Sequence, residues 1–232
     1  MNQYLKNIED QLQIQFKDST LLQRAFTHRS YLNENSDADL NNERLEYLGD
    51  AVLEFLISKE LYLKYPKRPE GDLTSFRSAM VKTETLAETA KELSFGTFLR
   101  MSKGEEKTGG REKEYLLANT FEAVLGALYL DQGIRACEKF LRRVLFPKIR
   151  HVVKHRLDID PKTKFQELAQ EIYKTTPTYE LLSERGPDHE KTFTMGVYLG
   201  NTEYGRGTGA SKQRAEEDAA RQALKTINAE TA

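Results

Sequence analysis

The sequence predicts two domains of different fold class. Residues 1–150 are expected to form an all-α domain, residues 151–160 a linker, and residues 161–229 a small α+β domain with the element order α-β-β-β-α. In the first part, apolar residues recur at every third or fourth position, which is the spacing of one helix face. Beyond residue 160, a helical pattern is followed by three extended segments and a final helical pattern, and this change predicts the boundary.

The helices of the first domain are predicted from periodicity and from the residues at their ends. Asp18 and Ser19 provide a helix start within the first helical stretch. The longest pattern runs from Asn42 to about Leu63 and stops before a segment with Pro and Gly at 65–72. Further patterns cover 73–93, with a break near 82–85, then 115–130 and 134–144. The charged, glycine-containing segment 103–111 is expected to be a loop.

The second domain is predicted from turn signals between its elements. A helix over 163–173 ends before Pro177, and extended segments begin at 178, 193 and 203, with Gly200 and Asn201 as a hairpin turn. The last helix is expected at 211–227 with Ser211 as its N-cap. This arrangement places Lys212 and free backbone amides at a helix N-terminus, which favours phosphate binding.

Composition restricts the possible settings and functions. The 232 residues contain one cysteine, Cys137, so neither a disulfide framework nor a zinc-binding set of cysteines exists, and a cytoplasmic location is expected. No apolar run reaches the ~18 residues that a membrane-spanning helix needs, so no membrane partner is expected. The formal net charge of −1 and the pI near 6.5 argue against nucleic-acid binding through overall charge. Any such binding must come from particular residues.

Three carboxylates share one face of the longest predicted helix. Glu43, Glu46 and Asp50 lie at positions i, i+3 and i+7, and like charges at this spacing repel one another. The apolar residues around them indicate that the helix is substantially buried. A divalent cation with oxygen ligands is the natural way to compensate this repulsion.

Two polar residues interrupt the most apolar helix of the sequence. Asn119 and Glu122 are three residues apart in a segment that is otherwise apolar on nearly every face. Buried polar side chains need partners. They can form a pair that is hydrogen-bonded to neighbouring backbone, or they can complete the oxygen cage begun by Glu46 and Asp50. The residues themselves do not decide between these alternatives.

Other polar segments also have a structural and a functional interpretation. His28 either steadies a helix end through hydrogen bonds or serves chemistry. Glu70 and Asp72 lie where a new helix begins, and carboxylates there stabilise the helix dipole. The basic stretch 147–156 either faces solvent or contacts phosphate.

These motifs resemble those of bacterial ribonuclease III over essentially the whole chain. The stretch from Asn42 to Asp50 is similar to the signature of that family, and the segments 27–30, 70–73 and 118–123 follow in the expected order around it. The C-terminal part is similar to the family's double-stranded RNA-binding domain, in the segments 161–167 and 210–212.

The resemblance implies an all-helical endonuclease domain that forms a homodimer and cuts double-stranded RNA. By position it assigns Asp50 and Glu122 as catalytic residues, and Glu46, Asp50, Asn119 and Glu122 as metal ligands. Glu43 and Glu70 would line the cleft, and Tyr47 would contact the partner subunit. Thr163, Gln166, His189, Ser211 and Lys212 would bind RNA in the second domain.

The implied chemistry is hydrolysis with a divalent metal, Mg²⁺ with Mn²⁺ as a substitute. Water as the attacking group predicts products with 5′-phosphate and 3′-hydroxyl ends, and the resemblance adds short 3′ overhangs. The expected substrates are ribosomal RNA precursors and other structured transcripts.

One position departs from the family pattern. Asn119 stands where the family usually has Asp, so a carbonyl oxygen remains but one negative charge is lost. This departure leaves a second function open, a regulator that binds double-stranded RNA with weak or no cleavage. Incubating an RNA duplex with the protein in Mg²⁺ and then in EDTA distinguishes the two.

Overall fold

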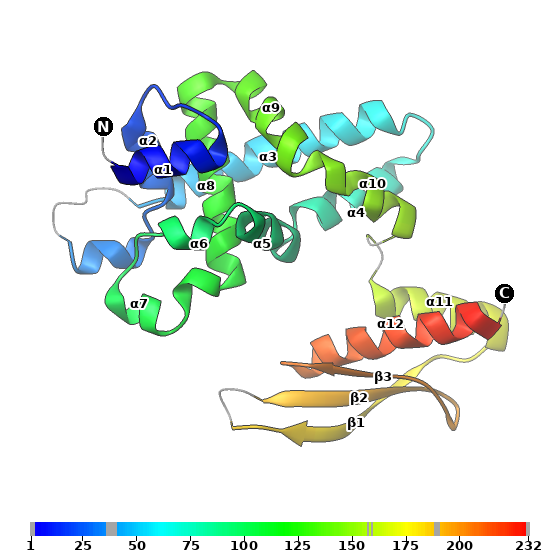
Figure 1. Cartoon of the computed structure of the whole chain (residues 1–232). Coiled ribbons are helices and arrows are strands. Elements are labelled where there is room, and N and C mark those ends of the chain that lie inside the picture. The colour runs from blue at the N-terminus through cyan, green and yellow to red at the C-terminus, as the bar shows by residue number, and fades with distance from the viewer. Residues whose placement is uncertain (1–2, 36–40, 157, 159, 188–190, 231–232) are drawn as a thin grey trace. The chain divides into compact units, whose positions relative to one another are not determined.

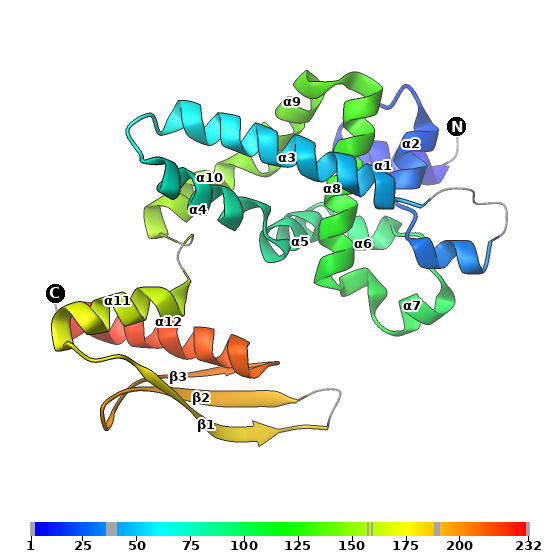
Figure 2. The same ribbon diagram turned by 180° about the vertical axis from the view of Figure 1, so that it is seen from behind.

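The computed structural model describes residues 3–35, 41–156, 158, 160–187 and 191–230 (Figures 1 and 2). The chain divides into two compact units, Met1–Asp158 and Ile159–Ala232, each with its own hydrophobic core. The first unit is helical and the second combines two helices with a three-stranded sheet, which confirms the predicted fold classes. No helix among the described residues has the length and apolarity required to cross a bilayer.

The first unit contains the following elements in chain order: α1 (Gln3–Leu12), α2 (Ser19–Ala25), η1 (Arg29–Asn33), α3 (Glu43–Lys64), α4 (Glu70–Val81), α5 (Thr83–Glu92), α6 (Phe95–Phe98), α7 (Lys103–Lys107), η2 (Gly110–Glu112), α8 (Glu114–Gln132), α9 (Ile134–Val144) and α10 (Phe146–His155). Asp18 caps α2 by accepting a hydrogen bond from the Thr20 amide at 2.9 Å, as predicted. The predicted break near 82–85 is the extended residue Lys82 between α4 and α5.

Helices α3 and α8 cross at the centre of this unit with their backbones in contact (Figures 1 and 2). A Cβ atom at Gly49 of α3 would lie 1.8 Å from the carbonyl oxygen of Glu122, and one at Gly126 of α8 would lie 2.1 Å from that of Leu45. Neither position has room for a side chain. The two glycines therefore allow the close approach that brings the polar residues of the two helices to the same place.

Aromatic side chains from distant segments support this crossing. Phe121 of α8 is fully buried and lies between Phe95, with ring centroids 6.3 Å apart, and Phe140, at 5.9 Å. Phe95 also meets Phe26 edge-on at 5.1 Å. Aromatic pairs at such distances stabilise a core beyond the area that they bury. The face of α8 opposite to its polar residues is thus held in place by packing.

Two sequence predictions for this unit are wrong. The segment 103–111, predicted to be a loop, forms α7 and η2; the Ser102 hydroxyl caps α7 by accepting a hydrogen bond from the Glu105 amide at 3.1 Å. The predicted linker 151–160 begins too early, because α10 continues through His155 and buries Val152 in the core of the first unit.

The second unit consists of α11 (Pro161–Tyr173), β1 (Thr178–Arg185), β2 (Thr192–Leu199), β3 (Thr202–Gly209) and α12 (Lys212–Glu230). The strands are antiparallel in the order β1-β2-β3, and the turn between β2 and β3 is at Gly200, whose φ is +60°. Ser211 caps α12 by accepting a hydrogen bond from the Arg214 amide at 3.2 Å, as predicted. Phe165 and a row of α12 alanines form the core against the sheet.

Candidate active site

A cleft of about 990 Å³ lies beside the crossing of α3 and α8. Glu46 and Asp50 lie on α3, one turn apart, and Asn119 and Glu122 lie on α8. All four line this cleft. The structure therefore brings together the two polar pairs that the sequence places in separate helices. Three carboxylates and one amide oxygen are available on the two sides of the glycine contact.

Burial and neighbouring carboxylates raise the pKa of two acids of this cleft, Glu122 and Glu46. Burial, and then the nearby charges of Asp50 and Glu46, raise the pKa of Glu122 to about 8. Burial and the charge of Glu43 raise the pKa of Glu46, while the hydrogen-bonding side chain of Asn119 acts in the opposite direction. Burial and neighbouring negative charge both favour the protonated form of a carboxyl group.

Within the described residues, no Lys, Arg or His forms an ion pair with Glu46, Asp50 or Glu122. In the same part of the chain, no three His, Cys, Asp or Glu side chains form a group that could hold a metal ion as they stand. The three carboxylates face one cleft without meeting at a common point.

Two other carboxylates at this cleft do have cationic partners. Glu43 lies 3.6 Å from the Arg29 guanidinium, and Glu105 lies 2.7 Å from the Lys113 amine. Glu43 thus differs from Glu46 and Asp50 although all three share a helix. Among the described residues, Glu46, Asp50 and Glu122 are the carboxylates of the cleft without a cationic partner.

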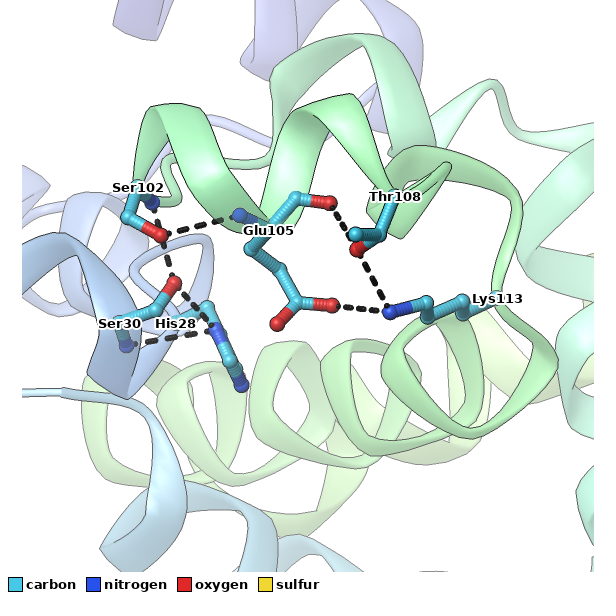
Figure 3. A network of polar contacts seen from close by, with 6 residues as sticks. All are labelled: His28, Ser30, Ser102, Glu105, Thr108 and Lys113. Carbon is cyan, nitrogen blue, oxygen red and sulfur yellow. Dashed lines mark hydrogen bonds and ion pairs between the residues drawn. The ribbon is translucent and has the colours of Figure 1, made fainter.

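A hydrogen-bond network joins the chain before η1 to α7 and to the start of α8 (Figure 3). The Nδ1 atom of His28 lies 2.8 Å from the Ser30 hydroxyl, and that hydroxyl accepts a hydrogen bond from the Ser102 amide at 3.0 Å. Lys113 donates to Glu105 at 2.7 Å and to Thr108 at 3.0 Å. The histidine caps η1, which agrees with the structural interpretation of His28.

Of two further residues that the family resemblance singles out, Tyr47 lies at the cleft and Glu70 does not. Tyr47 lines the cleft and is 83% exposed, so its ring is free to contact another molecule. Glu70 does not line the cleft within this chain, contrary to expectation; it lies in a separate groove with Phe55 and Tyr62. The reason is the length of α3, whose 22 residues span ~33 Å and separate Glu43 at its start from Glu70 beyond its end.

Four of the residues expected to bind RNA lie on the surface of the second unit. Thr163 and Gln166 are exposed on α11, and Ser211 and Lys212 are exposed at the start of α12. His189 lies outside the described residues. Lys212 is the first residue of α12, at the N-terminus of that helix.

Three further residues line the cleft that were not expected there, namely Arg29, Glu105 and Tyr115. A signal existed for Glu105, because Ser102 and Glu105 have the spacing of a helix N-terminus with a capping Ser. Arg29 carries no comparable signal, since only the folded chain brings it beside Glu43. Tyr115 lies one turn before Asn119 on α8, so helical spacing could have indicated it.

Comparison with known proteins agrees with this architecture. Residues 18–149 match the family model described as Ribonuclease-III-like, and residues 161–227 match the model of the double-stranded RNA binding motif. The chain is 47% identical over 228 residues to Ribonuclease 3 of Enterococcus faecalis, covering 97% of this chain and 98% of that protein. It is 45% identical over 225 residues to Ribonuclease 3 of Streptococcus sanguinis, covering 97% of each.

A solved structure of the nuclease domain of ribonuclease III from Campylobacter jejuni is also similar. It is 38% identical with a TM-score of 0.57, and the match covers 62% of this chain and 99% of that domain. The chain belongs to the ribonuclease III family and is an endoribonuclease with a C-terminal double-stranded RNA-binding domain.

Proposed function

We propose that this protein hydrolyses double-stranded RNA with Mg²⁺ held by Glu46, Asp50, Asn119 and Glu122, with Asp50 and Glu122 as the catalytic carboxylates. Mn²⁺ would substitute. The observation that carries the proposal is the set of carboxylates without cationic partners at one cleft, where burial and the nearby charges of Asp50 and Glu46 raise the pKa of Glu122 to about 8. Hard divalent cations prefer oxygen ligands, and the donors here are all oxygens.

The residues suit such a cation in type and in charge. A 2+ ion would offset the repulsion among Glu46, Asp50 and Glu122, and Asn119 would add a neutral oxygen next to Glu46. The backbone contact at Gly49 keeps the two helices close enough for ligands from both to share an ion. All four residues line one cleft.

Each residue would have a defined part in hydrolysis. Mg²⁺ supplies an activated water and stabilises negative charge on the phosphodiester. Asp50 and Glu122, on opposite sides of the helix crossing, would orient the attacking water in line with the leaving oxygen. Attack by water leaves the 2′-hydroxyl of RNA unused, so the products would have 5′-phosphate and 3′-hydroxyl ends.

A direct experiment tests this function. A long RNA duplex is incubated with the protein in Mg²⁺ and in EDTA, and the products are sized and their ends analysed. We expect short duplexes with 5′-phosphates and short 3′ overhangs in Mg²⁺ only. A gel shift without cleavage in Mg²⁺ would instead support an RNA-binding regulator.

Replacing Asn119 with aspartate should lower the Mg²⁺ concentration needed for cleavage. The added carboxylate restores the charge that an amide cannot provide, and carboxylates bind hard cations more strongly than neutral oxygens do. We expect the half-saturating Mg²⁺ concentration to fall about tenfold and the advantage of Mn²⁺ to shrink. Titrating both metals against initial cleavage rates checks this, and identical titration curves for the two proteins would contradict it.

We also propose that the enzyme works as a homodimer, with Tyr47 at the subunit contact. The 83% exposure of Tyr47 supports this, and so does the description of the Campylobacter jejuni nuclease domain as having a region involved in dimer formation. Its substrates would be ribosomal RNA precursors and other structured transcripts, in the cytoplasm.

The second unit would bind the duplex by shape, through Thr163 and Gln166 on α11 and Ser211 and Lys212 at the start of α12. Lys212 would meet phosphates together with the helix amides. Lys212→Ala should weaken RNA binding ~5-fold, whatever the RNA sequence. It should also reduce the salt slope, the slope of the logarithm of the binding constant against the logarithm of the salt concentration, by about one. Fluorescence anisotropy over a salt series measures both quantities. Lys225→Ala, a change in an exposed lysine of the same helix, is the control, and equal affinity of the two variants would count against the assignment.

A further inference from the structure

The carboxylates of the cleft and the RNA substrate of the proposed function carry charge of the same sign. Five carboxylates line the cleft, from Glu43, Glu46, Asp50, Glu105 and Glu122, and RNA brings further negative charge. Among the described residues, Arg29 is the only lysine or arginine that lines the cleft. Proteins bind nucleic-acid backbones mainly through Lys and Arg, so Arg29 is the cation placed to meet a phosphate there.

Within the part of the chain that the structure describes, Arg29 pairs weakly and with one carboxylate only. Its side chain is 73% exposed, that of Glu43 is 54% exposed, and their closest charged atoms are 3.6 Å apart. Exposed ion pairs of this kind contribute ~0–1 kcal/mol. Glu43 also has a second partner, because the Asn41 side chain donates to its other oxygen at 3.0 Å. When Arg29 moves away from Glu43, neither side chain is therefore left as an unpaired buried charge.

The backbone beside Arg29 is better fixed than its side chain. The amide of His28 donates to the carbonyl oxygen of Arg100 at 2.9 Å, and the amide of Arg100 donates to the carbonyl oxygen of Phe26 at 2.8 Å. His28 and Ser30, on either side of Arg29, belong to the network that reaches α7 (Figure 3). A fixed backbone with a free guanidinium is a good arrangement for binding a phosphate, which Arg can contact through two parallel hydrogen bonds.

We propose that Arg29 exchanges Glu43 for a phosphate of the RNA strand bound in the cleft. Without RNA, Glu43 keeps the guanidinium at the edge of the cleft; with RNA, the guanidinium pairs with the backbone next to the reacting carboxylates. Glu43 therefore competes with the RNA phosphate for the guanidinium of Arg29. This proposal rests on the proposed function, since it assumes that RNA enters this cleft.

The test is RNA binding in Ca²⁺, which carries the same charge as Mg²⁺ and also prefers oxygen ligands, together with cleavage kinetics in Mg²⁺. The probe is a duplex of roughly 30 base pairs, longer than the ~16 that one RNA-binding domain spans. Arg29→Ala should raise Kd and KM ~5- to 10-fold with kcat nearly unchanged, and reduce the salt slope by about one. Arg29→Lys should restore the salt slope. Arg135→Ala, which removes an exposed arginine of α9, should match the unmodified protein.

The exchange itself is tested by a double-mutant cycle with Glu43. Glu43→Gln should lower Kd ~2- to 3-fold by releasing Arg29, and this gain should vanish when Arg29 is already alanine. An unchanged Kd and salt slope in Arg29→Ala would overturn the phosphate contact. The same gain from Glu43→Gln in both backgrounds would overturn the exchange. If Mg²⁺ gives no cleavage while the Ca²⁺ binding data behave as expected, the metal-dependent function fails and the role of Arg29 stands.

Discussion

Replacing Glu122 with glutamine is expected to reduce RNA cleavage by ~10³- to 10⁴-fold while leaving RNA binding nearly intact. The substitution keeps the shape of the side chain but removes the carboxylate that faces Asp50 and Glu46 across the cleft. A metal site that loses a charged ligand loses several kcal/mol of transition-state stabilisation, and each ~1.4 kcal/mol is tenfold in rate. Single-turnover cleavage at saturating protein measures the chemical step. Glu84→Gln, the same change in an exposed carboxylate of α5, is the matched control.

Stability separates this loss of activity from unfolding. Because the pKa of Glu122 is raised from 4.5 to about 8, the folded protein without metal holds a proton that the unfolded chain releases between these pH values. Stability is therefore lost as the pH rises through this window. The glutamine cannot ionise, so the variant should be as stable as the unmodified protein below pH 4.5 and more stable by on the order of 4 kcal/mol near pH 8. Urea unfolding in EDTA at both pH values checks this; a destabilised variant would mean that the carboxylate is structural.

The same shift predicts how metal binding depends on pH. A cation binds the carboxylate form, so below pH 8 it must displace the proton of Glu122. The Mg²⁺ concentration needed for half-maximal cleavage should therefore fall as pH rises from 6 to 8, and in Glu122→Gln this dependence should be weaker for the residual metal binding.

The sequence was sufficient for the features that arise from local periodicity. The α3 pattern, the Asp18 and Ser211 caps and the break at Lys82 depend on residues close together in the chain, and the structure confirms them. The contact between α3 and α8 could also be predicted, because polar residues in buried helices need polar partners and each helix offers them to the other.

What could not be predicted depends on distances between elements. The exposed Arg29 reaches the cleft only because the folded chain places η1 beside Glu43 at the start of α3. The place of Glu70 was misjudged because a sequence motif does not state that a helix of 22 residues separates it from Glu43. Gly126 illustrates the same limit most clearly, since its role appears only when α3 lies against α8.

Replacing Gly126 with alanine is expected to destabilise the first unit by at least ~3 kcal/mol, the upper range for overpacked cores. The new Cβ would lie 2.1 Å from the carbonyl oxygen of Leu45, and at Gly49 the same change meets the carbonyl oxygen of Glu122 at 1.8 Å. These are backbone atoms of a packed helix, so no side-chain rotation relieves the overlap. For a unit of this size, ~3 kcal/mol corresponds to a fall in Tm of roughly 10 °C. Differential scanning calorimetry measures it.

Helix propensity alone predicts the opposite sign, which makes the comparison decisive. Alanine is favoured over glycine inside a helix by ~1 kcal/mol. Gly71→Ala in α4 provides that reference, because no atom lies within 4 Å of the added Cβ, and we expect it to raise Tm slightly. If Gly126→Ala also raised Tm, the helices would not be in backbone contact. The carboxylates of α3 would then lack the proximity to Glu122 on which a shared cation depends.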